Sequence, residues 1–269
     1  KSKQNSQIKQ LVDRASKYGM EFIVAALSHN LIEPIVEAGC SAITINASDI
    51  NNPAILDSAS KSAIPILLST MLASEDEIKW AINRLTQQGA TDILLLHGQH
   101  AMASTGEPLS VNDTSLGYIN SLRNKYNLPV GFTDHTPFKW MPASAVAAGA
   151  CIITKHLISS RKDKTPDWFI CLEPEEMESA IKNAKMIYNS MVDKEKNLLK
   201  AECDDKLIMR RSIVASKALK INHVLKYGDL SFKRPGTGLE PSSYNKLIGK
   251  RLKRNLDYDE QIKLSDLEN

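Results

Sequence analysis

Six apolar runs typical of β-strands alternate with helical segments over residues 1–190 of the chain. The predicted strands are Phe22–Leu27, Ala42–Asn46, Pro65–Ser69, Asp92–Gly98, Pro129–His135 and Cys151–Leu157. Amphipathic or alanine-rich segments lie between them, and the apolar residues of Glu75–Gln88 recur with a helical period. Gly39, Gly89 and Gly149 each stand before a strand, where a left-handed helix cap is expected. Repeated strand and helix units of this kind predict a parallel sheet covered by helices.

The choice between a closed barrel and an open nucleotide-binding sheet depends on phosphate-binding motifs. Neither GxGxxG nor GxxxxGK[ST] follows any predicted strand, so binding of a dinucleotide or a nucleoside triphosphate lacks support. We therefore predict an α/β fold of the TIM (β/α)8 type. Only six units are visible, however, and the chain opens on a predicted helix, Gln7–Tyr18. Either two units are absent from this sequence or the sheet does not close.

Two histidines, His135 and His156, each stand at the end of a predicted strand. The alanine-rich segment Pro142–Ala150 between the strands is long enough for a crossover helix, so the strands should be parallel neighbours. Both rings would then lie at the carboxyl ends of the strands, where α/β folds bind ligands, and imidazole is a good ligand for divalent metals. The alternative is a pair of structural histidines, because two ligands are fewer than most complete metal sites have.

The composition excludes several classes of protein. Hydrophobic residues make up 42% and charged residues 24% of the chain, which is typical of globular proteins. No apolar run approaches the length of a transmembrane helix, and the four cysteines lack metal-binding or disulfide spacing. The net charge is only +3, and the basic cluster Lys246–Arg254 lacks interleaved aromatic residues, so we interpret it as a solvated helix face. We expect a cytoplasmic protein without a nucleic-acid or membrane partner.

A composition shift follows the predicted barrel. Residues 191–205, rich in Lys, Glu and Asp, predict a solvated connection to a small second domain at residues 206–269, which contains a predicted helix Ser242–Leu252. The Pro/Gly-rich loop Lys233–Gly238 could simply reverse the chain. It also places Arg234 beside a rigid turn, which suits recognition of a carbonyl or carboxylate group.

Segments in both domains resemble the sialic acid synthase family, whose enzymes condense phosphoenolpyruvate with an N-acetylated hexosamine. In the barrel the matching segments are Gly131–Thr136, Lys155–His156, Pro166–Asp167 and Leu172–Glu176. In the small domain they are Arg210–Ser212, Lys233–Gly238 and Ile248–Lys250, which are similar to the antifreeze-like SAF module of these synthases. The order and spacing of so many segments make the resemblance specific.

The resemblance implies a (β/α)8 barrel followed by an SAF domain. It also implies a domain-swapped homodimer in which each SAF domain covers the barrel mouth of the partner. Family members carry about two further strand and helix units before the segment that matches Gln7–Tyr18. We therefore expect the barrel to be incomplete at the N-terminus of this sequence.

The resemblance further implies a divalent metal, Mn²⁺ or Mg²⁺, held by His135 and His156. Lys155 is a third candidate catalytic residue, although a lysine at a strand end often keeps its head in solvent. Asp134 is expected to orient the loop or a ring nitrogen.

The substrate contacts implied by the resemblance come from both domains. Ser69 and Thr70 match a pair that holds phosphoenolpyruvate, but such hydroxyls equally often cap a following helix. Asp167 matches a residue that contacts the sugar, but an aspartate after proline is also a common turn former. Arg234 matches the arginine that reaches across the dimer to the N-acetyl group.

Several positions depart from the family pattern, among them Met102 in place of a tyrosine and Trp168 in place of a histidine. Thr44 stands where the family carries a phosphate-binding lysine, and Ala47 where it carries a serine. Thr154 replaces a glutamate before the Lys-His pair, and Ala101 replaces an asparagine of the sugar-binding loop. Losses at the phosphoenolpyruvate and proton-transfer positions would each cost orders of magnitude in rate. His100 and Lys61 are the candidates for compensation.

Two functions therefore stay open. The first is a synthase that condenses phosphoenolpyruvate with N-acetylmannosamine or a related sugar, including precursors of legionaminic or pseudaminic acid. The second is a degenerate, non-catalytic paralogue that acts as a binding or regulatory partner. A metal-dependent barrel aldolase unrelated to phosphoenolpyruvate is more remote, because the SAF module argues against it. We expect this sequence alone to be inactive or very weak as a catalyst.

Overall fold

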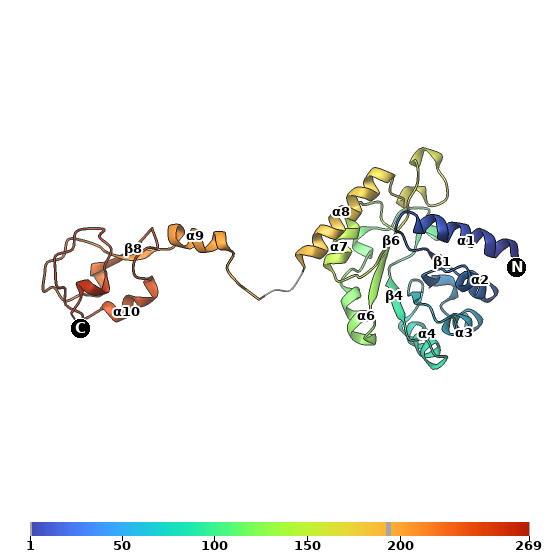
Figure 1. Ribbon diagram of the computed structural model, residues 1–269, viewed down its shortest axis with the longest axis horizontal. Coiled ribbons are helices and arrows are strands. Elements are labelled where there is room, and N and C mark those ends of the chain that lie inside the picture. Colours follow the sequence, from blue (N-terminus) through green and yellow to red (C-terminus); the bar gives the residue numbers. More distant parts are fainter. Residues whose placement is uncertain (1, 192–194, 269) are drawn as a thin grey trace. The chain divides into compact units, whose positions relative to one another are not determined.

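The computed structural model describes residues 2–191 and 195–268 of the chain. The chain forms two compact units, Lys1–Val192 and Asp193–Asn269 (Figure 1). None of the described helices is both long and apolar enough to cross a membrane.

The first unit is built on a parallel sheet whose six strands follow the order of the chain. The strands are β1 Ile23–Ala25, β2 Ala42–Ile45, β3 Ile66–Ser69, β4 Ile93–His97, β5 Val130–Asp134 and β6 Ile153–Lys155. Within the described residues, each strand pairs with its sequence neighbours, and β1 and β6 are the edges. The predicted α/β fold of six parallel strands is confirmed, with the sheet curved into an open half-barrel (Figure 1).

Helices pack against the outer face of this sheet. The helices whose side chains join this core are α1 Ser2–Ser16, α2 Ile32–Glu37, α3 Pro53–Ser60, α4 Glu75–Gln87, α6 Tyr118–Tyr126 and α7 Met141–Ala147. The short helix α5 Met102–Thr105 lies in the loop after β4, and α8 Pro174–Ser190 packs against α7. Local chemistry sets several of their ends: Ser74 and Glu77 form a capping box at the start of α4, and Gly89 has φ +102° beyond its end. Gly39 and Gly149 also adopt the expected left-handed conformation.

The pleat of the strands divides their side chains between two faces. Ile43 and Phe132, for example, are fully buried against the helices in the main core. Thr44 and Thr133, one position further along the same strands, instead line a cavity on the inner face. This period of two decides which residues of a strand can reach the site.

The second unit contains one antiparallel pair of strands and short helices. Its elements are α9 Lys200–Met209, β7 Ser212–Ala215, β8 Leu230–Lys233 and α10 Tyr244–Leu247. Helix α9 begins within the segment predicted as a connection, and the Leu207 carbonyl accepts a hydrogen bond from Gly236 N at 2.8 Å. The loop after β8 is thereby tied to α9.

The predicted helix Ser242–Leu252 is wrong beyond Leu247, where α10 ends. Ile248 already has extended backbone, with ψ 133°, and Gly249 after it has φ +85°, so the chain turns away from the helical path. Leu252 then forms an antiparallel bridge with Leu267. Pairing with a distant segment therefore overrides the local helical pattern.

The interpretation of the basic cluster as one helix face is wrong for the same reason. Lys246 lies on α10, but the remaining basic residues of the cluster follow the helix. The Arg254 guanidinium forms ion pairs with Asp266 and Glu260, each at 2.7 Å. Part of the positive charge therefore stabilises the fold of the small unit.

Candidate active site

A cavity of about 490 Å³ lies at the carboxyl ends of the parallel strands, the usual ligand-binding end of such sheets. Its lining combines hydroxyl, imidazole and apolar side chains: Thr44, Asn46, Ala47, Ser48, Ser69, Met71, Leu72, Leu96, His100, Met102, Thr133, His135, Thr154, His156 and Asp167. The site therefore draws on β2 to β6 and on the loops that follow them.

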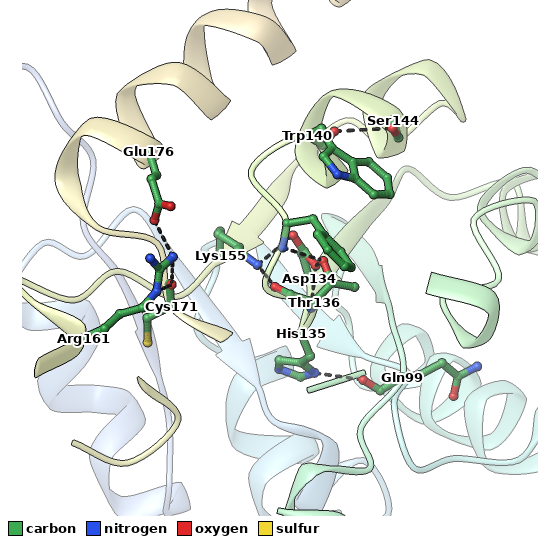
Figure 2. Close-up of polar contacts among 11 residues, drawn as sticks. Gln99, Asp134, His135, Thr136, Trp140, Ser144, Lys155, Arg161, Cys171 and Glu176 are labelled. Atoms are coloured by element: carbon green, nitrogen blue, oxygen red, sulfur yellow. Dashed lines mark hydrogen bonds and ion pairs between the residues drawn. The ribbon is translucent and has the colours of Figure 1, made fainter. Parts of the chain in front are cut away.

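The two predicted metal-binding histidines lie side by side in this cavity. β5 and β6 are parallel neighbours as predicted, and the ring centres of His135 and His156 are 5.6 Å apart. His135 Nδ1 lies 2.8 Å from the Gln99 backbone carbonyl (Figure 2). Because a carbonyl only accepts, Nδ1 carries the proton and Nε2 keeps the lone pair that binds a metal.

Both histidines are held in the form that a metal needs. Burial lowers the pKa of His135, and the neighbouring imidazoles lower it further, against a raising effect of the hydrogen bond to Gln99. Burial also lowers the pKa of His156, against an opposing effect of Asp167. Both rings are therefore neutral at neutral pH.

A third histidine, His100, lines the same cavity. Its ring stands edge-on to His135, with ring centres 5.2 Å apart and planes at 88°. The sequence pointed to His100 only as a compensating residue, because it lies on the loop after β4 and belongs to no recognisable ligand motif.

Lys155 does not line the cavity, although it precedes His156 in the chain. Its ammonium lies 2.9 Å from the Asp134 carboxylate, and the two side chains are 4% and 0% exposed. The ammonium also donates to the Thr136 carbonyl, and Asp134 accepts from Thr136 N and Oγ1 at 2.8 and 2.7 Å (Figure 2). The pair lies on the outer face of the sheet, where burial lowers the pKa of Lys155.

Ser69 and Thr70, the two residues predicted to hold phosphoenolpyruvate, line different cavities. Ser69 lines the cavity, and its buried hydroxyl has no hydrogen-bond partner among the described residues. Thr70 points elsewhere: its Oγ1 donates to the Leu96 carbonyl at 3.1 Å, and it lines a separate cavity. The alternative role of both as helix caps is wrong, because Ser74 caps the following helix α4.

The two predicted sugar contacts lie in different units. Asp167 lines the cavity at a left-handed position, φ +62°, on a loop that Arg161 holds through the Cys171 carbonyl (2.9 Å) and the Glu176 carboxylate (Figure 2). Arg234 is exposed on the loop after β8 in the second unit. No hydrogen bond or ion pair within the described part of the chain engages its guanidinium.

The positions that depart from the family pattern lie largely in the site. Thr44, Ala47 and Thr154 line the cavity, whereas Ala101 only precedes the lining residue Met102. The lining, taken over the described residues, contains neither lysine nor arginine. Lys61 lines a different cavity, between α2 and α3, so it does not supply the missing positive charge.

The site fits a divalent metal only in part. Two neutral imidazoles on adjacent strands offer two ligands and leave positions for substrate and water. Within residues 2–191 and 195–268, no three or more His, Cys, Asp or Glu side chains stand ready as a metal cluster. The remaining ligands of a bound ion would therefore have to come from substrate or water.

Both units match known protein families in sequence. The sequence model of the NeuB family matches residues 2–196, and that of the SAF domain matches residues 210–268. The N,N′-diacetyllegionaminic acid synthase of Campylobacter jejuni is 32% identical over 257 residues, which cover 95% of this chain and 75% of that protein. An N-acetylneuraminate-9-phosphate synthase of Drosophila melanogaster is 25% identical and covers 94% of this chain and 73% of its own length.

Solved structures show the same fold. The N-acetylneuraminic acid synthetase of Leptospira borgpetersenii, solved with citrate, aligns with a TM-score of 0.68 and 26% identity over 75% of this chain and 68% of that chain. A spore coat polysaccharide biosynthesis protein of Bacillus subtilis aligns with a TM-score of 0.63 over 97% of this chain and 76% of that chain. At 19% identity the second likeness concerns the fold alone.

Proposed function

The chain belongs to the NeuB family, and we propose that it condenses phosphoenolpyruvate with an N-acetylated hexosamine to give a nonulosonic acid and phosphate. N-acetylmannosamine or a related sugar is the proposed acceptor. The observation that carries the proposal is the pair His135 and His156, two neutral imidazoles on adjacent strands inside the cavity. As a biosynthetic enzyme of this class, the protein is proposed to act in the cytoplasm.

The proposed reaction joins carbon to carbon. The C3 carbon of phosphoenolpyruvate forms a bond to the aldehyde carbon of the open-chain sugar, whose oxygen takes up a proton. Water then adds to the cationic C2 and loses one proton to leave a hydroxyl group there. Phosphate leaves as its bond to C2 breaks, and the hydroxyl loses its proton to become the keto group of the product. A bound Mn²⁺ or Mg²⁺ would act as a Lewis acid on the aldehyde oxygen.

The residues of the chain bind and orient the reactants. His135 and His156 would hold the metal, and the Gln99 carbonyl keeps the His135 ring in the required tautomer. The unpaired Ser69 hydroxyl is available to donate a hydrogen bond to an anionic oxygen of phosphoenolpyruvate. Asp167 is proposed to contact the acceptor sugar, and Thr70 to support the strand end through Leu96.

Two of the predicted site residues, Lys155 and Arg234, do not line this cavity. We propose that Lys155 positions the end of β5 through Asp134 rather than contacting substrate, because both side chains are buried on the outer face. Arg234 is proposed to reach the N-acetyl group in the site of a partner protomer within a domain-swapped homodimer.

A degenerate, non-catalytic paralogue is the second candidate, and the cavity lining favours it. Phosphoenolpyruvate is an anion, yet the described lining offers no lysine or arginine, and Thr44 and Ala47 stand at the phosphate-binding positions. A site without that charge would bind phosphoenolpyruvate weakly and turn it over slowly.

The first experiment measures phosphate release from phosphoenolpyruvate with Mn²⁺ and N-acetylmannosamine. We expect slow release that requires both the sugar and the metal, and a loss of at least about a hundredfold in His156→Ala, because metal activation contributes several kcal/mol. Thr44→Lys should accelerate release, since it returns an ammonium to the cavity. His29→Ala, which alters an exposed histidine outside this cavity, is the matched control.

The two candidate functions give different outcomes. Release that disappears in His156→Ala but not in His29→Ala supports the synthase. An absence of release with every N-acetylated hexosamine, in wild type and in Thr44→Lys alike, leaves the non-catalytic partner.

A further inference from the structure

A second cavity, of about 510 Å³, is lined by residues of the second unit. It lies between the end of α9, the glycine loop after β8 and the turn that begins at Glu240. Its volume is close to the 490 Å³ of the candidate active-site cavity and falls in the range of small-molecule sites. The proposed function uses none of the residues that line it.

Three cations line this cavity, and one carboxylate opposes them. Lys206 lies in the last turn of α9, and Arg210 and Arg211 follow the helix. The Arg211 Nη1 donates to the Phe232 carbonyl at 3.0 Å, which fixes this guanidinium beside β8. Glu240 is the single acidic residue of the described lining. The excess of positive charge makes an anion the ligand that the cavity favours.

Glu240 leaves much of the hydrogen-bonding capacity of these cations unused. Its carboxylate lies 3.9 Å from Lys206 Nζ and 3.6 Å from Arg210 Nη1, beyond hydrogen-bond distance in both cases. The ion pairs of Arg254 in the same unit, by contrast, are 2.7 Å long. Loose pairs between exposed side chains contribute little to stability, so an incoming carboxylate or phosphate can take the place of Glu240.

Close packing of the glycine loop against α9 shapes the cavity. Gly236 N donates to the Leu207 carbonyl at 2.8 Å, and a Cβ at Gly236 would lie 2.8 Å from Arg210 Cβ. Leu207 and Pro241 add an apolar wall beside the cations. A lining that combines apolar surface with a few charged groups suits an organic anion better than a bare inorganic ion.

We propose that this cavity binds a small organic anion through a carboxylate or phosphate group. Arg210 and Lys206 are the principal contacts, and Glu240 is a built-in competitor for them. The inference goes beyond the proposed function and does not depend on it, because the cavity of the first unit contains none of these residues. The loop Lys233–Gly238 carries Arg234, so a ligand that bridges α9 and the turn at Glu240 would also hold that loop in place.

The test follows the backbone amide signals of the ¹⁵N-labelled whole chain during titration with phosphoenolpyruvate, N-acetylneuraminate or inorganic phosphate. Gly236 and Gly238 line this cavity, so their signals should shift and saturate with at least one of these anions. Arg210→Gln should weaken that binding at least about tenfold, because it removes a charged hydrogen-bond donor. Glu240→Gln should strengthen it about two- to fivefold, because the competing carboxylate is gone. Lys253→Gln, at an exposed lysine outside the cavity, is the matched control with the same change in charge and should bind like wild type.

The outcomes separate a specific site from the general field of a basic unit. Equal weakening in Arg210→Gln and Lys253→Gln would overturn the site, because the anion would then respond to net charge alone. An absence of shifts at Gly236 and Gly238 with all three anions would also overturn it. Shifts with N-acetylneuraminate support the site through carboxylate recognition, and shifts with inorganic phosphate support it through phosphate recognition. Since these signals belong to the second unit, their failure leaves the proposed function standing, and an absence of phosphate release leaves this site standing.

Discussion

Lys155 and His156, adjacent at the end of β6, lie on opposite faces of the sheet. His156 lines the cavity, whereas Lys155 lies in a buried ion pair with Asp134, its register partner on β5. The sequence motif suggested a catalytic role for both residues of the Lys-His pair. The alternation of side chains along a strand shows that only one of them can face the cavity.

Replacement of Lys155 tests its structural role. Lys155→Met leaves the Asp134 carboxylate buried without its cation, so the free energy of unfolding should fall by about 3–5 kcal/mol. Urea denaturation measures this loss. Lys79→Met, at an exposed lysine on α4, is the control and should change stability by less than about 0.5 kcal/mol.

Two results would contradict this role of Lys155. Equal stability of the Lys155→Met and Lys79→Met variants would show that the ion pair contributes little. Loss of phosphate release at unchanged stability would instead indicate that Lys155 acts directly on substrate.

At the scale of the element, β5 depends on a close approach to both neighbouring strands. A Cβ added at Gly131 would lie 2.8 Å from the Ile152 carbonyl oxygen and 2.8 Å from a methyl carbon of Leu96. That carbonyl accepts the hydrogen bond from Phe132 N, also at 2.8 Å, that joins β5 to the segment leading into β6. A methyl group there would push the two histidine-bearing strands apart.

Gly131→Ala should therefore affect both stability and the site. We expect a loss of about 1–3 kcal/mol in the free energy of unfolding, the usual cost of overpacking, together with weaker binding of Mn²⁺. Gly117→Ala is the matched control, because a Cβ at Gly117 meets nothing within 4 Å. Denaturation and metal titration of the two variants check the prediction, and wild-type values for Gly131→Ala would refute it.

The elements also differ in how far local sequence determines them. Helix α4 was predictable because Ser74, Glu77 and Gly89 are local start and stop signals. Helix α10 was not, because the segment after Leu247 pairs with Leu267, far along the chain. Strands β2 to β5 are buried along most of their length and stood out as apolar runs, and the predicted strands match all six to within a few residues.

At the scale of the whole molecule, the proposed domain swap makes one site depend on two protomers. If Arg234 acts in the barrel of the partner, Arg234→Ala and His156→Ala should each be inactive alone. A mixed dimer then contains one intact site, formed by the unmodified barrel and the unmodified SAF domain. Mixing and reassembling equal amounts should restore about a quarter of wild-type phosphate release, because half of the dimers are mixed and half of their sites are intact.

The same mixing experiment has two outcomes that would contradict the proposed domain swap. If each SAF domain served its own barrel, every protomer in the mixture would carry one defect, and no release would return. Full activity of Arg234→Ala by itself would remove Arg234 from the site.

The sequence by itself determined the class of the fold, the strands and the two histidines of the candidate metal pair. These follow from short-range patterns: apolar runs, local caps, and residues that directly follow strands. Only the tertiary structure decided that Lys155 and Thr70 turn away from the cavity, that α10 stops early, and that His100 stands beside His135. Each of these depends on the pleat of a strand or on contact between distant segments. Such contacts form only when the chain is folded, so no local pattern records them.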